Sequence, residues 1–166
     1  MNGNPREDDH VFMRLALDQA AHSAAVGEVP IGAVLVHEGA IVAQSHNYRE
    51  AWQDPTAHAE MIAIREGAKA LGRWRLIETT LLVTLEPCAM CLGAIILARI
   101  PRLVFGARDP KAGACGSVLD FANDPRLNHR VDVIGGILEE ESQRLLTQFF
   151  KDLRAQQPDF DPREAS

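Results

Sequence analysis

The fold of this chain is set by the stretch TTLLVTLEPCAMCLGAIILA, which spans Thr79–Ala98. Its first part, Thr79–Thr84, is rich in leucine and β-branched residues and predicts a buried strand. Its last part, Ala89–Ala98, is an apolar run that predicts a helix buried on most sides. The motif Pro87-Cys88-Ala89-Met90-Cys91 lies between them and places two thiols at the start of the helix. A strand that leads directly into a helix is the repeating unit of an α/β protein.

Four further segments predict strands. Ile31–His37 and Ile41–His46 are β-branched, and the turn Glu38-Gly39-Ala40 between them favours a hairpin. Arg102–Gly106 and Val131–Ile134 are expected to be the fourth and fifth strands. About 25 residues separate these two strands, which is too long for a hairpin and fits a crossover, so we expect them to be parallel. Within the connection, Val118–Phe121 is a candidate for the start of a helix.

Three further helices are predicted from their start signals and spacing. One runs from a cap at Asp8 or Asp9 to about Ala25, and another from Pro55, behind an Asp54 cap, to about Leu71. The last follows Gly135-Gly136, and its apolar residues recur at helical spacing: Leu138, Leu145, Leu146, Phe149, Phe150 and Leu153. A hairpin followed by β/α alternation predicts a three-layer α/β/α fold with a five-stranded mixed sheet whose last two strands are parallel.

Length and composition predict a single domain over residues 1–156 and a disordered acidic tail over residues 157–166. The net charge of −6 at first argues against a nucleic-acid partner. Residues 1–10 and 157–166 each contribute −2, however, so the intervening residues carry only −2. No apolar run approaches the roughly 20 residues of a membrane span, and residues 1–10 lack the apolar core of a secretion signal. Three cysteines, two of them in a C-x-x-C motif, suit a reducing compartment, so we expect a cytoplasmic protein.

His58-Ala59-Glu60 supplies the other groups that a reactive metal site requires. A catalytic zinc site uses three protein ligands and leaves its fourth position to water, and His58, Cys88 and Cys91 meet that count. Cys88 and Cys91 are three residues apart, so their thiols lie on one face of the helix. Glu60 remains as an acid or base that can move protons between an activated water, a ring nitrogen and a departing amine. The sequence predicts one zinc ion per subunit and hydrolytic deamination of an amino-heterocycle.

Two other interpretations of these residues stay open at this point. Cys115 would complete a structural Cys₃His site without an open metal position, although it lies in a glycine-rich segment. A zinc-stabilised RNA-binding or scaffold protein without turnover would need the same three ligands but has no use for Glu60.

The order His-x-Glu followed by Pro-Cys-x-x-Cys is typical of zinc nucleobase deaminases. Longer segments resemble one family, the bacterial tRNA-specific adenosine deaminases, and the similarity extends from Met13 to about Leu153. The segments that carry it are Val29–Val34, His46-Asn47, His58–Glu60, Thr84–Cys91 and Gly106–Ser117. The resemblance implies a cytidine-deaminase-like fold and a homodimer that converts adenosine to inosine at the wobble position of a tRNA anticodon stem-loop.

The same resemblance implies roles for individual residues. Zinc ligation falls to His58, Cys88 and Cys91, and proton transfer to Glu60. Asn47 is implied to hydrogen-bond the target nucleotide, Asp109 to lie near the ribose of a flanking loop nucleotide, and Phe150 to stack on an unpaired base. The alternatives are structural: Asn47 as a turn residue at a strand end, Asp109-Pro110 as a plain turn, and Phe149 with Phe150 as core residues.

The competing enzymatic interpretation is a deaminase of a small molecule such as cytosine, guanine or a free nucleotide. It would use the same zinc and glutamate, so the metal motif does not exclude it. The predicted crossover weighs against free-cytidine deaminases, which resemble this fold but finish with a hairpin. One departure concerns the C-terminal end, where Asp159, Asp161 and Glu164 stand in place of the basic tail common in the family.

Overall fold

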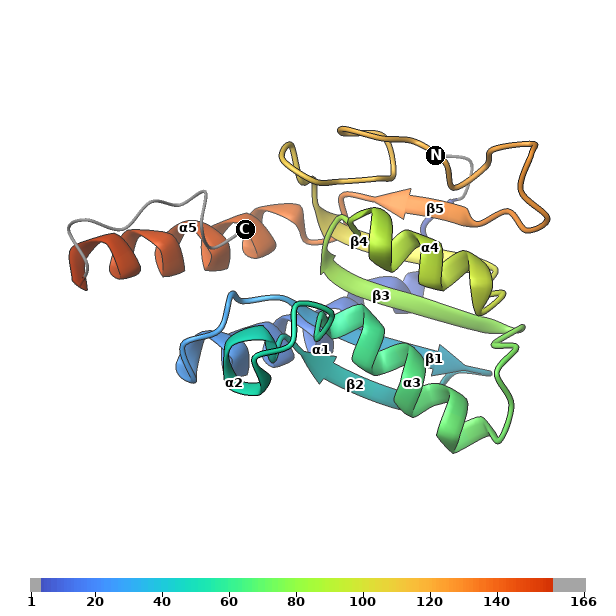
Figure 1. The fold of residues 1–166 in the computed structure, drawn as a ribbon, viewed down its shortest axis with the longest axis horizontal. Coiled ribbons are helices and arrows are strands. Elements are labelled where there is room, and N and C mark those ends of the chain that lie inside the picture. Colours follow the sequence, from blue (N-terminus) through green and yellow to red (C-terminus); the bar gives the residue numbers. More distant parts are fainter. Residues whose placement is uncertain (1–3, 157–166) are drawn as a thin grey trace.

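The computed structural model describes residues 4–156, in which five strands form one sheet in the order β2-β1-β3-β4-β5 (Figure 1). β1 pairs antiparallel with β2 and with β3, whereas the pairs β3–β4 and β4–β5 are parallel. This arrangement confirms the predicted mixed sheet with its last two strands parallel. The strands are β1 (Gly32–His37), β2 (Ala40–His46), β3 (Thr79–Leu85), β4 (Arg102–Ala107) and β5 (Asp132–Gly135).

Helices cover both faces of the sheet, as predicted, and divide the core into two layers (Figure 1). The helices are α1 (Glu7–Ala25), α2 (Arg49–Trp52), α3 (Ala59–Leu71), α4 (Ala89–Leu97) and α5 (Glu139–Gln156). α3 and α4 pack on the face that carries Leu35, Val83 and Phe105. α1 packs on the other face, against the alternate residues Val34 and Leu82. The period-2 alternation of strand side chains therefore assigns each helix its own hydrophobic layer.

Two predicted helix starts are wrong, and local hydrogen bonds explain both. α1 is capped at Arg6, whose backbone N–H donates to Asp9 Oδ2 at 2.7 Å, so Asp9 lies inside the first turn rather than before it. α3 begins at Ala59, not at Pro55. The backbone N–H and the hydroxyl of Thr56 both donate to Asp54 Oδ1 at 2.7 Å. A side chain that accepts from the residue two positions on favours a turn over a helix.

The connection from β4 to β5 also differs from its prediction, because Val118–Phe121 forms no helix. The backbone N–H groups of Val118 and Leu119 donate to the carbonyl of Gly113 at 2.9 and 3.0 Å, and Cys115 forms an isolated bridge with Asp120. The segment is therefore folded back on itself as a compact loop. The predicted disordered tail, residues 157–166, lies outside the described residues. None of the helices within residues 4–156 is long and apolar enough to cross a membrane.

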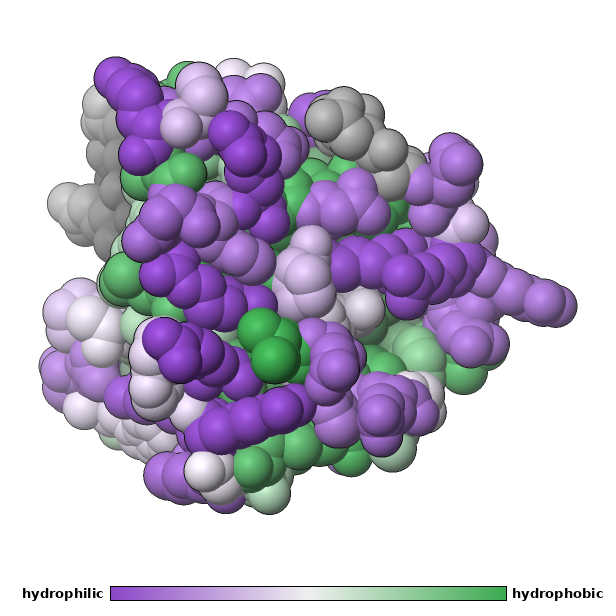
Figure 2. Space-filling view, turned by 90° about the vertical axis from the view of Figure 1, so that its right-hand side faces the viewer, coloured by the Kyte–Doolittle hydropathy of each residue, from purple (hydrophilic) through white to green (hydrophobic). Residues whose placement is uncertain are grey.

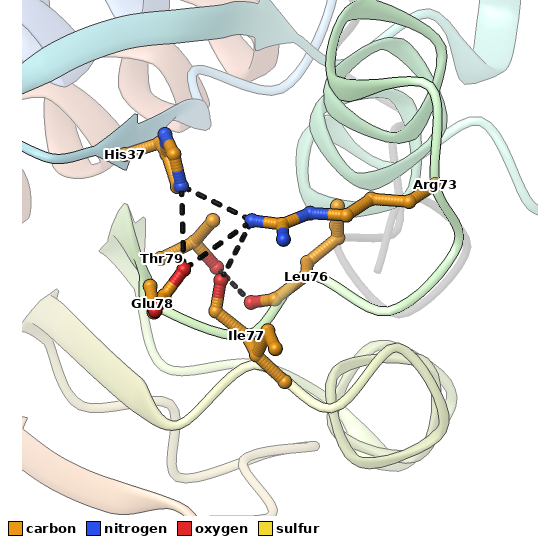
Figure 3. A network of polar contacts seen from close by, with 6 residues as sticks. All are labelled: His37, Arg73, Leu76, Ile77, Glu78 and Thr79. Atoms are coloured by element: carbon orange, nitrogen blue, oxygen red, sulfur yellow. Dashed lines mark hydrogen bonds and ion pairs between the residues drawn. The ribbon is translucent and has the colours of Figure 1, made fainter.

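Polar contacts join the segments at the end of the sheet where β1 finishes and β3 begins. Figure 2 shows this side of the molecule covered mainly by hydrophilic residues, with small hydrophobic areas between them. The Arg73 guanidinium lies 3.1 Å from His37 Nε2 and 3.6 Å from the Glu78 carboxylate (Figure 3). The Thr79 hydroxyl donates to the Leu76 carbonyl and fixes the turn before β3.

A buried ion pair ties α1 to the start of β4. The Arg102 guanidinium donates two hydrogen bonds of 2.7 Å to the Asp9 carboxylate, and the two side chains are 6% and 4% exposed. Burial alone would raise the pKa of Asp9, but the hydrogen bonds from Arg102 and from the Arg6 backbone outweigh it and lower that pKa. The pair therefore stabilises the fold above the ordinary carboxyl pKa, and this contribution is lost as the pH falls through the lowered value.

We expect Arg102→Met to lower the free energy of unfolding by about 3–5 kcal/mol, because it leaves the Asp9 carboxylate buried without its charge partner. The double variant Asp9→Leu with Arg102→Met should recover most of this loss. Urea unfolding at pH 7 and fixed zinc concentration measures both. Arg126→Met, which breaks the exposed pair with Asp124, is the matched control and should leave stability unchanged. A single variant as stable as the wild type would contradict the assignment.

Candidate metal centre and active site

The predicted metal ligands come from the N-termini of two helices at the carboxyl-end edge of the sheet (Figure 1). His58 is the residue before α3, and Cys88 is the residue before α4. Both have extended backbone conformations, with φ/ψ of −74°/150° and −73°/174°, and neither side chain caps its own helix. Cys91 follows in the first turn of α4. All three side chains are thus available to a ligand.

The three donor atoms have the spacing of a tetrahedral zinc site. His58 Nδ1 lies 3.5 Å from Cys91 Sγ and 3.8 Å from Cys88 Sγ, and all three atoms lie within 4.8 Å of one another. Zinc–sulfur and zinc–nitrogen bonds of about 2.3 and 2.0 Å, at tetrahedral angles, separate nitrogen from sulfur by about 3.5 Å. The residues therefore fit a zinc ion. Within residues 4–156 they form the one such group of three or more candidate ligands.

The two thiols differ in acidity. A hydrogen bond from Cys91, with a second from His58, lowers the pKa of Cys88 to about 4 despite its partial burial. Donating that bond, together with burial, raises the pKa of Cys91. Cys88 is therefore a thiolate at neutral pH, and a bound divalent cation displaces the proton from Cys91, because a coordinating thiol is deprotonated.

Glu60, in the first turn of α3, shares this site. Its side chain is 4% exposed, and Oε2 is the one buried side-chain polar atom in residues 4–156 that has no hydrogen-bond partner. Burial raises the pKa of Glu60. A carboxyl group that titrates closer to neutrality is suited to take up and release protons. An unpartnered buried oxygen is costly for folding alone, which favours a functional role for this side chain.

Cys115 lies outside the ligand group. It is 4% exposed, and its backbone N–H donates to Glu86 Oε1 at 2.8 Å in the loop after β4. Burial raises the pKa of its thiol to about 12. The donor atoms that cluster within 4.8 Å are those of His58, Cys88 and Cys91 alone. The structural Cys₃His interpretation is therefore wrong for the described residues.

A cavity of about 580 Å³ opens onto the metal ligands and brings together the three predicted substrate-binding residues, Asn47, Asp109 and Phe150. Asn47 is 2% exposed, and its side-chain oxygen accepts the N–H of Ala59 at 3.1 Å. Asp109 accepts backbone N–H groups from Lys111 and Ala112, so it also forms the turn that was the alternative. Phe150 contacts Phe149 edge-to-face and belongs to neither core cluster of the described residues.

Glu86 is a site residue that the sequence did not single out. It is 1% exposed and accepts four hydrogen bonds from the loop after β4. The donors are the backbone N–H groups of Asp109, Cys115 and Ser117, at 3.1, 2.8 and 3.1 Å, and the hydroxyl of Ser117. A side chain on Gly113 would clash with this carboxyl group at 2.5 Å. One buried carboxylate thus holds the loop that forms a wall of the cavity.

Comparison with known proteins agrees with this geometry. A family model of the cytidine and deoxycytidylate deaminase zinc-binding region matches residues 6–107. The tRNA-specific adenosine deaminase of Bacillus subtilis is 50% identical over 146 residues, which are 88% of this chain and 91% of that protein. The chain belongs to the family of tRNA-specific adenosine deaminases. Its relative from Haemophilus influenzae, with the same name, is 49% identical over 89% of this chain and 86% of that protein.

A solved structure extends the family assignment to the fold. It comes from a study of A-to-I editing by tRNA:A34 deaminases at the wobble position of transfer RNA. The two structures superpose with a TM-score of 0.79 at 48% identity, over 82% of this chain and 99% of the other. This agreement confirms that the chain has the predicted cytidine-deaminase-like fold.

We expect Cys91→Ser to lose nearly all bound zinc, because the variant replaces a thiolate ligand with a hydroxyl that stays protonated. Cys115→Ser is the matched control, since it changes the same atom at a position outside the ligand group, and it should keep one zinc per subunit. Metal analysis after dialysis against a weak chelator measures both. Zinc loss in the Cys115 variant would revive the structural Cys₃His interpretation.

We expect Glu86→Gln to loosen the loop after β4, because the amide nitrogen cannot accept and leaves at least one of the three backbone donors unpaired. Each lost partner costs about 1–3 kcal/mol. Hydrogen exchange at Asp109, Cys115 and Ser117 should accelerate, and the free energy of unfolding should fall. Glu66→Gln, an exposed change on α3, is the control. Unchanged exchange in the Glu86 variant would show that the carboxylate does not hold this loop.

Proposed function

We propose that this protein is a zinc-dependent hydrolytic deaminase that converts adenosine to inosine at the wobble position of a tRNA anticodon loop. The observation that carries the chemistry is the buried, unpartnered Oε2 of Glu60 beside the three zinc ligands. The observation that carries the substrate is the 50% identity to a tRNA-specific adenosine deaminase over most of both chains. The parallel pairing of β4 and β5 favours this substrate over free cytidine, because free-cytidine deaminases finish with an antiparallel hairpin.

The overall reaction adds water at C6 of adenine and releases ammonia. His58, Cys88 and Cys91 would hold a zinc ion, which would supply a water of lowered pKa at neutral pH. Glu60 Oε2 takes up the proton of the attacking water and delivers it to a ring nitrogen of adenine; it then takes up the proton of the new C6 hydroxyl and delivers it to the departing amine. Burial raises the pKa of Glu60, which favours the uptake of a proton by this carboxylate.

Three residues orient the nucleotide in this proposal. The oxygen of the Asn47 side chain is occupied by Ala59 N–H, so its amide nitrogen is the group that donates to the target base. Asp109, held in its turn by Lys111 and Ala112, accepts from the ribose of a flanking nucleotide. Phe150, on the α5 wall of the cavity, stacks on an unpaired base. Extrusion of the target costs little because a base in a hairpin loop is already unpaired.

Assembly and location complete the proposal. We infer that the enzyme acts as a homodimer in the cytoplasm, where tRNA is modified. Its three cysteines are free of disulfides, as a reducing compartment requires. Residues 157–166 carry a net charge of −2, so affinity for RNA depends on cationic residues at the cavity itself, such as Arg49 and Arg154.

We expect the purified protein to form inosine in an ACG-anticodon stem-loop and to leave free adenosine and cytidine almost unchanged. Glu60→Ala should keep one zinc per subunit while activity falls by several orders of magnitude, because the proton carrier is removed. Glu66→Ala, an exposed change on the same helix, is the matched control. Inosine is measured by nuclease digestion and chromatography. Rapid ammonia release from a free base with an inert stem-loop would favour a small-molecule deaminase, and normal turnover of the Glu60 variant would refute its role.

A further inference from the structure

A column of three stacked aromatic rings stands beside the cavity. The rings of His46 and Tyr48 are 4.2 Å apart at 22°, and those of Tyr48 and Trp52 are 4.5 Å apart at 17°. The column runs from the end of β2 to α2, which lies at the same end of the molecule as α5 and the start of α3 (Figure 1). Asn47 and Arg49, which lie between these rings in sequence, line the cavity. The segment that carries the column therefore also contributes two side chains to the site.

The outer end of the column is open. Trp52 is 51% exposed, although Tyr48 covers one face of its ring. A core role does not account for an indole placed in this way, because none of the three rings belongs to either core cluster of the described residues. The open face offers a flat apolar surface of the size of a nucleobase.

The column is held rigidly by the backbone around it. The Tyr48 N–H donates to the Ala57 carbonyl at 3.0 Å and closes the segment between them. Glu28, which is 2% exposed, accepts the N–H of Ala51 at 2.8 Å and anchors α2. A platform that is already ordered loses little conformational entropy when it binds a partner.

Charge and geometry favour an unpaired nucleotide as that partner. Arg49 lies on the same turn of α2 as Trp52 and lines the cavity together with His58. Its guanidinium can pair there with a phosphate of the RNA strand that enters the site. Unstacked bases bind aromatic side chains face to face, and every base has a face to offer. A loop whose target base is drawn into the cavity leaves its neighbours unstacked at the rim.

We propose that Trp52, backed by Tyr48 and His46, stacks on an unpaired base of the RNA substrate next to the target nucleotide. This inference rests on the proposed function and adds to it a recognition element outside the cavity. It gives the protein a further contact to the loop, in addition to those of Asp109 and Phe150, which free nucleosides cannot reach.

The chain offers a matched control, because Trp52 and Trp74 are its two tryptophans. Trp74 is similarly exposed, at 58%, and is covered by the Arg75 guanidinium. It follows the C-terminus of α3, a helix of 13 residues whose N-terminus carries the site. At 1.5 Å per residue it lies about 20 Å away.

The test uses single-tryptophan variants in a Glu60→Ala background, so that the RNA is not altered during titration. We expect the fluorescence of Trp74→Phe protein, which reports Trp52, to be quenched by an anticodon stem-loop. The Trp52→Phe protein, which reports Trp74, should not respond. A fully paired RNA of the same length should quench neither. Equal responses of the two proteins, or none, would overturn the proposal.

Kinetics on the active protein supply the second readout. Trp52→Ala should raise KM for the stem-loop about tenfold with little change in kcat, whereas Trp52→Phe and Trp74→Ala stay near wild type. Zinc content and oligomeric state are measured alongside. A loss of activity accompanied by a change in oligomeric state would assign Trp52 to a contact between copies and refute the proposal. If the wild type forms no inosine, the proposed function fails; if it does and Trp52→Ala matches it, this inference fails alone.

Discussion

The constraint on which the site depends is the meeting of two helix N-termini at one edge of the sheet. His58 and Cys88 each occupy the position before a helix, in extended backbone, so their side chains point away from the helices and toward each other. The positive ends of two helix dipoles favour the thiolate of Cys88 and the carboxylate of Glu60. The sheet supplies the rigidity, because β3 leads directly to Cys88 and pairs with β1 and β4 along its length.

Much of this architecture was predictable, because hydrophobic periodicity is a local property of sequence. The strands lie within one or two residues of their predicted positions, and the C-x-x-C spacing located two ligands. The errors have another origin. Asp54 accepts from Thr56 and so shortens the predicted helix, and the N–H groups of Val118 and Leu119 turn back to Gly113. Such side-chain and loop hydrogen bonds compete with helix formation and leave no periodic signal.

Glu86 shows more clearly what local sequence patterns do not predict. Its partners lie 23 to 31 residues later in the chain, so no spacing rule connects them. The aromatic column is an intermediate case. Its three residues are close in sequence, but their stacking depends on the turn between β2 and α2, which the buried Glu28 anchors from the end of α1. In both cases a buried carboxylate organises backbone that periodicity leaves unspecified.

The way α5 is attached to the rest of the fold affects the cavity. The helix extends away from the sheet (Figure 1), and Ser142, near its start, is its one buried residue, packed so closely on Gly106 that a Cβ there would meet Ser142 Oγ at 2.3 Å. The 14 residues beyond Ser142 form a lever of about 21 Å, so a tilt of about 5° at its base moves its tip by roughly 2 Å. This part of α5 carries three residues that line the cavity, Leu146, Phe150 and Arg154. A tilt of this size would therefore change the width of the cavity mouth without displacing the metal ligands, which lie at the starts of α3 and α4.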